Sequence, residues 1–474
     1  MPKQQHITWT QVSSSSPLSL SSMPISLSLI DSHVGLWLRR AHLFVSICGV
    51  SKSSAAKAKA AKAAEKARDV AIEAMEKHGD HVHVLAYAAA SMFVAAAQLQ
   101  QSRPNPVAAL RAIDLALIRG GIADWASIAR PLIVQATNLL KGNELGKETP
   151  KLQQTKTKTR KDPPRPSQYL TTPNVKDIPR IDARSLSADE FCKRYMLANP
   201  PQPVILTNVI GSWPACTKWK DLNYLKSVTA GRLVPVETTT KQDAGRSFLS
   251  ESWSHRVIPL DEYISKFVQP DGASPSSEPE NEDLHGYLAQ HQLLDQIPQL
   301  RDDIDIPRFC SAHTPEDDAT PCDCEYRHDP LVSAWFGPAG TVSPLHNDPY
   351  HNVLAQIVGS KYIRIYDAKD TDAVYPESNR LGHNSRVDID APFSEIRSKF
   401  PLFVDAPCWQ TILKEGELLY MPRHVWHYVR SLETSFSASF WFGAKMELVK
   451  NKKSGKYETK HLKKAEKGKS LNIQ

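Results

Sequence analysis

The stretch TVSPLHNDPYHNVLAQIVGSKYIRIYD, residues 341–367, decides the fold. Its runs 352–358 and 361–367 are rich in β-prone residues and flank Gly359 and Ser360, a pair that suits a tight two-residue turn. The expected hairpin pairs Val358 with Lys361. Because side chains alternate along a strand, one face then carries Asn352, Leu354, Gln356, Lys361, Ile363 and Ile365. A face that is mostly apolar with a few separated polar groups is typical of a buried small-molecule pocket.

The residues just before this hairpin suggest a metal site. His346 and Asp348 are two positions apart on a strand and therefore point the same way. Two protein ligands are too few for a catalytic metal, so a third should come from a neighbouring strand. Of 17 histidines, His427 is the best placed, because a β run, a proline-containing turn and a new β run bring it back toward the same sheet. Two histidines and one aspartate are the ligand set of the facial triad that binds Fe(II).

Lys361 adds a second feature of such a site. An anionic co-substrate that chelates the metal needs a buried cation for its far carboxylate, and Lys361 supplies one. Each element also has a plainer explanation. His346 and Asp348 could be a surface polar pair, Lys361 could be solvated, and His427 could be a core histidine. Only their joint spacing favours the metal site over these alternatives.

The region around this stretch has the pattern of a β domain. Short β-prone runs at 203–210, 233–240, 416–422 and 435–443 alternate with turn residues, as in a β-sandwich or barrel. Two helical segments, 222–231 and 258–267, interrupt the early strands. Residues 270–283 are expected to be a disordered surface insertion because they are rich in Pro, Ser and Glu.

The rest of the chain divides by composition. Residues 53–140 are Ala-rich with helical spacing and predict an all-α N-terminal domain whose Ala-rich faces pack together. Residues 1–52 are Ser-rich with a single acid and are expected to be a disordered or targeting segment. Residues 141–175 form a basic linker, 176–445 the catalytic domain, and 446–474 a basic tail. The net charge of the whole chain is +7. Residues 141–165 carry +5 and residues 445–469 carry +7, so the rest of the chain carries about −5.

Composition also limits location and class. Seven scattered cysteines do not form a disulfide framework, which favours a reducing compartment. We expect the nucleus, the cytoplasm or both, with mitochondrial targeting as the lesser alternative. The chain has no uninterrupted apolar stretch of about 18 or more residues, so we expect no membrane span. Cys310, His313, Cys322, Cys324 and His328 could hold zinc, but their spacing fits no standard zinc site and a variable surface loop is the preferred interpretation.

Two longer segments carry a family resemblance. AWFGPAGTVSPLHNDPYHNVLAQIVGSKYIRIYD, residues 334–367, and GELLYMPRHVWHYVRSLETSFSASFWFG, residues 416–443, resemble the JmjC family of Fe(II)- and 2-oxoglutarate-dependent oxygenases, and within it the small JmjC hydroxylases. The likeness covers about residues 175–445. It implies a mainly β catalytic domain, a double-stranded β-helix of jelly-roll or cupin-like form with flanking helices.

The resemblance also assigns site residues. It implies that His346, Asp348 and His427 bind iron. It implies a 2-oxoglutarate site made by Lys361, Tyr287, Ser343 and Asn352, with Trp335 and Trp441 lining it. A weaker correspondence places three residues in the substrate pocket: Glu237, Trp253 and Gln290. His351, on the opposite side of the strand, is expected to lie outside the site.

The implied activity consumes O2 and 2-oxoglutarate and oxidises a protein or peptide. A narrow acidic slot would orient a guanidinium, so arginine hydroxylation is preferred. The alternative is histone lysine N-methyl demethylation. A third hypothesis, of another class, is a catalytically inactive JmjC-like scaffold that binds a partner through its helical domain. The basic linker and tail could add weak nucleic-acid contact.

Overall fold

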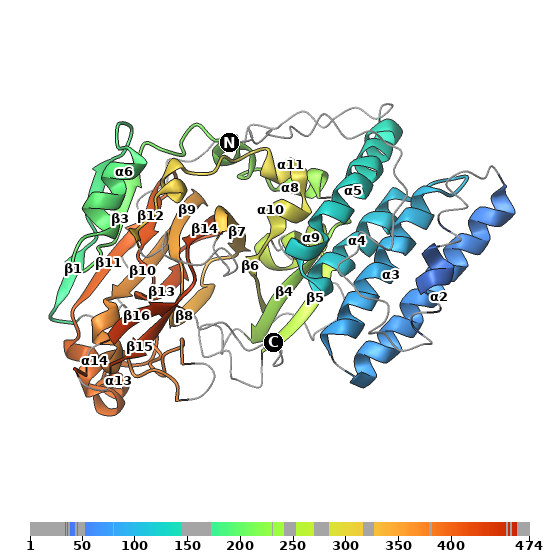
Figure 1. Ribbon diagram of the computed structural model, residues 1–474. Helices are drawn as coiled ribbons and strands as arrows, with labels where there is room; N and C mark the ends of the chain where they lie inside the picture. Colours follow the sequence, from blue (N-terminus) through green and yellow to red (C-terminus); the bar gives the residue numbers. More distant parts are fainter. Residues whose placement is uncertain are drawn as a thin grey trace. The chain divides into compact units, whose positions relative to one another are not determined.

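A computed structural model shows the fold of the chain (Figure 1). The residues that it describes are parts of 34–45, and then 53–78, 80–144, 172–229, 231–240, 253–269, 284–315, 327–378, 382–451, 454–455 and 457–461. The chain divides into two compact units. Unit 1 comprises Met1–Lys158, Thr229–Pro235 and Val257–Asp261, and unit 2 comprises Thr159–Val228, Val236–Arg256 and Glu262–Gln474.

Unit 1 is built from helices. They are α2 (Ser54–His78), α3 (His81–Leu99), α4 (Pro106–Gly120) and α5 (Ile122–Glu144). Local sequence explains two of the starts. The Asp80 carboxylate accepts the His83 amide at the beginning of α3, and Asn105 accepts the Ala108 amide before Pro106 in α4. The helix α5 has a weaker sequence signal because Pro131 lies inside it.

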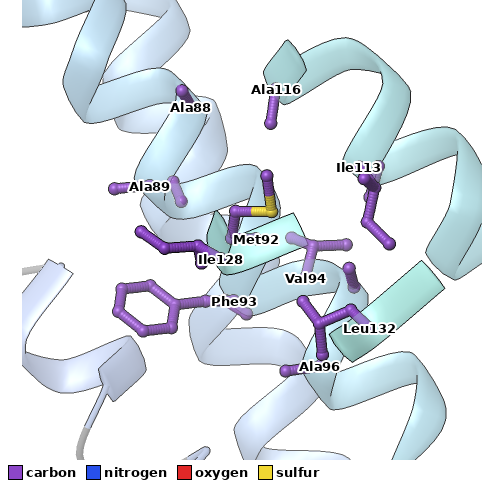
Figure 2. Packing of buried hydrophobic residues seen from close by; sticks show 14 of the residues in the cluster. Ala88, Ala89, Met92, Phe93, Val94, Ala96, Ile113, Ala116, Ile128 and Leu132 are labelled. Carbon is purple, nitrogen blue, oxygen red and sulfur yellow. The ribbon is translucent and has the colours of Figure 1, made fainter. Parts of the chain in front are cut away.

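Small side chains let these helices approach closely, and one hydrophobic core runs between them (Figure 2). Ala88, Met92 and Phe93 of α3 are fully buried there. The core also includes helical residues of the predicted N-terminal segment, namely Val34, Leu38, Ala41 and Val45. α3 is long and apolar enough to cross a membrane by length and composition, but most of its side chains are buried in this core.

A buried ion pair holds the segment Thr229–Pro235 to α4 within unit 1. The Arg232 guanidinium donates to both carboxylate oxygens of Asp114, with distances of 2.6–3.0 Å, and the Leu233 amide donates to the same carboxylate at 2.8 Å. Both charged side chains are almost completely buried. Removing either one would leave the other buried without its counter-charge.

Unit 2 is mainly β, with short helices between the strands. Its elements before the central stretch are β1 (Val175–Asp177), β2 (Arg180–Asp182), α6 (Ala188–Phe191), β3 (Val204–Thr207), α7 (Ala215–Lys218), α8 (Leu222–Val228), β4 (Leu233–Thr240), β5 (Ser254–Pro259), α9 (Leu260–Tyr263), β6 (Leu284–His291), α10 (Leu293–Gln296), α11 (Pro298–Arg301) and β7 (Arg327–Gly337). β4, β5 and α9 each have residues in both units. The two predicted helical interruptions are confirmed as α8 and α9.

The remaining elements of this unit extend from the central stretch to His461. They are β8 (Val342–Asn347), β9 (His351–Val358), β10 (Lys361–Tyr366), α13 (Phe393–Lys399), α14 (Pro401–Asp405), β11 (Cys408–Leu413), β12 (Leu418–Met421), β13 (Trp426–Ser431), β14 (Ser435–Gly443), β15 (Met446–Lys450) and β16 (Tyr457–His461). β15 and β16 pair within the predicted basic tail. Lys450 and Tyr457 from this pair both donate to the Asp372 carboxylate.

β1 to β14 form two sheets of the expected jelly-roll type, and β15 and β16 form a separate two-stranded sheet (Figure 1). One sheet has five strands in the order β1-β11-β10-β13-β8, and the other has nine in the order β2-β3-β12-β9-β14-β7-β6-β4-β5. Ile363 and Ile365 of the first sheet and Leu354 and Leu419 of the second belong to one buried cluster. The cupin-like β class predicted from the sequence is therefore confirmed.

The predicted hairpin at Gly359 is wrong. β9 pairs with β12 and β14, whereas β10 pairs with β11 and β13, so the two strands lie in different sheets. Gly359 has φ 76°, and a Cβ there would lie 2.2 Å from the Thr434 carbonyl oxygen. Gly359 and Ser360 carry the chain from one sheet to the other instead of forming the turn of a β-hairpin. Asn352 and Lys361 still border one interior cavity because the inner faces of both sheets point toward it.

Candidate functional site

Three predicted metal ligands meet on unit 2. His346 on β8 and His427 on β13 are direct cross-strand partners, and Asp348 follows the end of β8. One potential ligand atom from each of the three lies within 4.8 Å of the others. The His427 Nε2 atom is 3.6 Å from Asp348 Oδ2, and the two imidazole rings are 4.2 Å apart between centroids. The predicted convergence of these three side chains is therefore present.

Backbone carbonyls orient both imidazoles. His346 Nδ1 donates to the Pro344 carbonyl at 2.7 Å, and His427 Nδ1 donates to the Val425 carbonyl at 3.1 Å. This tautomer leaves each Nε2 lone pair free for a metal. Burial, followed by the charge of His346, lowers the pKa of His427 to about 4. A neutral imidazole is the form that binds a metal ion.

The donor set fits Fe(II). Two imidazole nitrogens and one carboxylate on one side match the facial triad. The small cavity, defined here by Ser343, His346, Asp348, Asn352, Lys361 and His427 among its lining residues, has a volume of about 20 Å³. Asn352 is 4% exposed, and its Oδ1 has no hydrogen-bond partner among the described residues. A buried polar atom without a partner is costly, and a polar ligand would satisfy it.

Lys361 is buried at the same cavity. It is 2% exposed, and its Nζ donates to the Tyr287 hydroxyl at 3.2 Å. Burial lowers the pKa of Lys361 to about 7. Burial, and next the charge of Glu237, raise the pKa of Tyr287, so its hydroxyl stays protonated and can donate. A buried ammonium group beside a hydroxyl suits an incoming carboxylate.

A larger cavity adjoins the small one and shares Trp335, Ser343, His346 and Asp348 with it. We call it the main cavity, and its volume is about 610 Å³. Glu237 lines it from β4, directly opposite Tyr287 on β6. Burial raises the pKa of Glu237 to about 7, and Oε2 has no hydrogen-bond partner among the described residues. This acidic group is suited to bind a cation.

The other predicted residues have mixed positions. Gln290 lines the main cavity at a β-bulge in β6, with φ 49°. Trp335 borders both cavities and donates through Nε1 to Ser439 at 2.8 Å. Trp441 lies opposite Asn352 and stacks on Tyr350, with ring centroids 6.2 Å apart. Trp253, just before β5, is not among the lining residues of the two cavities and so is not brought to the site.

One wall of the main cavity was not predicted. It comes from the segment between β10 and β11 and includes Glu377, His383, Asn384, Ser385 and Asp388. This segment covers the free edge of β8 with main-chain hydrogen bonds. The Ser385 amide donates to Leu345 and the Asn347 amide to His383, at 2.8 and 2.9 Å. A loop has no periodic pattern, so only its position could have revealed this role. Of the residues weighed as a zinc site and interpreted as a surface loop, Cys310 is buried, while Cys322 and Cys324 lie outside the described residues.

Comparison with known proteins agrees with this geometry. The family model described as "Cupin-like domain" matches residues 188–447, more than half of the chain. The chain therefore belongs to the cupin-like domain family. Within that family it resembles the JmjC oxygenases, and in particular proteins named lysine-specific demethylase 8.

Three relatives illustrate the range. "Lysine-specific demethylase 8" of Xenopus tropicalis is 40% identical over 267 residues, which are 56% of this chain and 52% of the relative. "Lysine-specific demethylase JMJ30" of Arabidopsis thaliana is 41% identical over 270 residues, covering 56% of each chain. "Bifunctional peptidase and (3S)-lysyl hydroxylase JMJD7" of Homo sapiens is 24% identical over 272 residues, 52% of this chain and 79% of the relative. The chain spans little more than half the length of the first two.

Proposed function

We propose that this protein is an Fe(II)- and 2-oxoglutarate-dependent oxygenase that hydroxylates an arginine side chain of a protein or peptide. One observation carries the proposal. Two imidazoles with free Nε2 atoms and a carboxylate gather within 4.8 Å, on a cavity that also contains a buried lysine. A metal ligand set and a carboxylate-binding cation are rarely both needed in a purely structural core.

His346, Asp348 and His427 would hold the iron, each at a defined atom. The imidazoles would bind through Nε2, because Nδ1 of each is already bonded to a backbone carbonyl. When bound, Fe(II) with O2 and 2-oxoglutarate supplies the oxidant for a C–H bond. The protein's own part is to place the substrate carbon beside this group and to restrict water around it.

Lys361, Tyr287 and Ser343 would bind the far carboxylate of 2-oxoglutarate, and Asn352 would lie near its metal-binding end. Lys361 and Tyr287 are already in hydrogen-bond contact. The charge on Lys361 is costly in its buried position, as its lowered pKa shows. A carboxylate would stabilise that charge, so the binding of the co-substrate is favoured by the desolvation of the lysine. Trp335, which borders both cavities, would confine the co-substrate from one side, whereas Trp441 lines neither cavity.

Glu237 and Gln290 favour an arginine over an uncharged side chain. A buried carboxylate with one oxygen, Oε2, that lacks a hydrogen-bond partner among the described residues is matched by the planar fork of donors on a guanidinium. Gln290 can add an amide acceptor on the same cavity. The proposed order of recognition is thus charge pairing with Glu237, then placement of the target carbon toward His346 and Asp348.

A second candidate is demethylation of an N-methyl-lysine. Two observations favour it, the names of the relatives and the main cavity of about 610 Å³, which has room for a bulky ammonium. Hydroxylation of an N-methyl carbon would release formaldehyde. The residues that hold the metal and 2-oxoglutarate are the same for both reactions.

Succinate formation and product mass test these proposals. Purified protein is incubated with Fe(II), 2-oxoglutarate and panels of arginine- and methyl-lysine-containing peptides, with His346→Ala as the control. A gain of one oxygen atom on arginine supports hydroxylation, and a loss of one CH2 unit per methyl group supports demethylation. No iron-dependent turnover with any peptide would favour the inactive scaffold instead.

We further propose the division of the chain into segments 1–52, 53–140, 141–175, 176–445 and 446–474. Location in the nucleus, the cytoplasm or both is proposed as well, with mitochondria as the alternative. The basic linker and tail are proposed to contact nucleic acid weakly. Fluorescent fusions with and without residues 1–52, and salt-dependent binding to RNA and DNA, test these points.

A further inference from the structure

The turn between β12 and β13, residues 422–425, is fastened to the chain segment that follows Asp348. The His424 amide donates to the Asp348 carbonyl at 2.8 Å. One residue earlier, Arg423 Nε donates to His351 Nε2 at 2.9 Å. The turn leads directly into His427. These two bonds therefore join the segment that carries the proposed ligand His427 to the segment that carries the proposed ligand Asp348.

His351 is well placed to act as this anchor. It is 2% exposed, and Arg423 is 8% exposed. Nε2 accepts from Arg423 Nε, while Nδ1 lies 2.9 Å from the Tyr420 hydroxyl and 3.4 Å from the Arg423 amide, which donates to it. Both ring nitrogens of His351 are therefore engaged by Arg423 and Tyr420. A bond from a charged guanidinium in a buried setting is among the stronger hydrogen bonds available to a protein.

A second set of bonds holds the same region from the C-terminal side. Arg423 Nη1 donates to the Ala444 carbonyl at 3.3 Å. The Met446 amide, at the start of β15, donates to the Pro349 carbonyl at 3.2 Å. Arg423 thus links His351 to the segment after β14. The first residue of β15, Met446, is bonded to Pro349, which directly follows Asp348. The chain from Asp348 to His351 is held on two sides.

The backbone of the turn shows that these contacts impose its shape. His424 has φ 63°, in the left-handed region that residues with a side chain seldom adopt. Its ring is 2% exposed, and neither ring nitrogen has a hydrogen-bond partner among the described residues. Both features are unfavourable by themselves and persist only where the surroundings fix the conformation.

We propose that Arg423 and His351 are positioning residues of the metal centre, which set Asp348 relative to His427. Asp348 needs such support because it lies beyond the last residue of β8, whereas His346 and His427 lie within paired strands. The inference rests on the proposed function, since it assumes that the three side chains bind a divalent metal. It assigns a role to His351, which the sequence placed outside the site.

Metal affinity tests the inference without measuring turnover. Mn(II), as a stand-in for Fe(II), is titrated into the full-length protein with 2-oxoglutarate present, and free Mn(II) is followed by electron paramagnetic resonance. His351→Leu removes the acceptor and should weaken Mn(II) binding roughly 10- to 100-fold, the range for supporting residues around a metal. His351→Gln keeps an acceptor oxygen for Arg423 and should bind within about threefold of wild type.

The controls separate positioning from a general loss of stability. A purely structural role would lower the melting temperature of the metal-free protein and leave the affinity of the folded protein for Mn(II) unchanged. That result, or equal affinities of the Leu and Gln variants, would overturn the inference. If His351→Leu does not fold, Arg423→Gln carries the same test. Failure of the wild type to bind Mn(II) would instead count against the proposed function.

Discussion

The two sheets of unit 2 contribute different chemistry to the same interior. The five-stranded sheet carries His346 and Ser343 on β8, His427 on β13 and Lys361 on β10, three neighbouring strands. The nine-stranded sheet carries Glu237, Tyr287, Gln290, Trp335, Asn352 and Trp441. Every proposed metal-binding histidine and the proposed co-substrate cation therefore belong to one sheet. The acid proposed to select the substrate belongs to the other.

The groups on the two sheets also differ in how they are supported. Main-chain carbonyls fix the imidazoles on the five-stranded sheet. On the nine-stranded sheet, Glu237 Oε2, Asn352 Oδ1 and Trp441 Nε1 are buried without hydrogen-bond partners among the described residues. The imidazoles of the first sheet are oriented before any ligand arrives, while Glu237 and Asn352 of the second sheet each present a buried oxygen that a polar ligand would satisfy. Changes to the proposed metal-binding histidines of the first sheet should abolish chemistry, and changes to Glu237 of the second should alter selectivity.

The largest effect is expected from the metal ligands. His346→Ala or Asp348→Ala should lower iron-dependent succinate formation at least about 100-fold, because even residues that only support a metal ligand contribute up to that much. Succinate is measured with saturating 2-oxoglutarate. His255→Ala, on an exposed position of β5, is the matched control and should retain wild-type activity. Iron-dependent turnover by the Asp348 variant would contradict the proposal that Asp348 is a required metal ligand.

A smaller effect is expected at Lys361. Lys361→Ala should weaken 2-oxoglutarate binding by at least about 30-fold, since removing one partner of a buried charge pair costs about 2 kcal/mol or more. Mn(II) affinity, measured without 2-oxoglutarate, should change by less than about threefold. Lys399→Ala, whose exposed side chain pairs with Glu395, is the control. Equal loss of metal and co-substrate binding would mean that Lys361 is a structural residue.

Substitution of Glu237 should affect only the binding of the peptide substrate. Glu237→Gln should raise the KM for an arginine peptide about tenfold, because a hydrogen bond to a charged group contributes about 1.5 kcal/mol or more. Peptide-independent consumption of 2-oxoglutarate should not change. Glu262→Gln, in a surface ion pair with Lys266, is the control. A loss of 2-oxoglutarate turnover without peptide would show that the two sheets do not divide the chemistry as described.

The pH dependence of binding should have opposite signs for the two sheets. Lys361, with a pKa of about 7, must be protonated to bind a carboxylate, so 2-oxoglutarate affinity should fall as pH rises above 7, by up to about tenfold per unit. Glu237, also with a pKa of about 7, must be ionised to bind a cation, so arginine-peptide affinity should fall as pH drops below 7. Calorimetric titration across this range measures both.

Variants without the titrating group provide the controls for this test. Lys361→Arg, which keeps its charge, should flatten the 2-oxoglutarate profile above pH 7. Glu237→Gln should flatten the peptide profile below pH 7. A pH profile that survives either substitution would assign that titration to another group.

The convergence of His346, Asp348 and His427 could be predicted from the sequence because side chains alternate along a strand. His346 and Asp348 are two positions apart, and β12 and β13 return His427 to the neighbouring strand of the same sheet. The pairing of β9 with β10 could not be predicted. Two residues can close a hairpin or cross between sheets, and bonds with distant residues, such as that from the Leu432 amide to the Ser360 carbonyl at 2.9 Å, favour the crossing.

Other parts of the site depend on tertiary structure alone. The wall formed by Glu377, His383 and Asp388 comes from a loop that the sequence marks with no periodicity. The pKa of Glu237 near 7 results from burial, which a single strand pattern does not reveal. His351 was correctly placed on the other side of its strand, yet its bond with Arg423 depends on a turn 72 residues away in the sequence.

The register of β10 against β13 sets the distance between the proposed metal ligand His427 and the proposed co-substrate cation Lys361. His427 pairs with Ile365, and Lys361 lies four positions further along β10 on the same face, a backbone separation of about 13 Å at 3.3 Å per residue. The proposed co-substrate, a short dicarboxylate, would lie between these two positions. A slip by one residue would turn the lysine away from the interior, and a slip by two would change the span by about 6.6 Å. Under the proposed function, the main-chain hydrogen bonds between β10 and β13 would therefore set the length of the diacid, so single substitutions would alter the substrate more easily than the co-substrate.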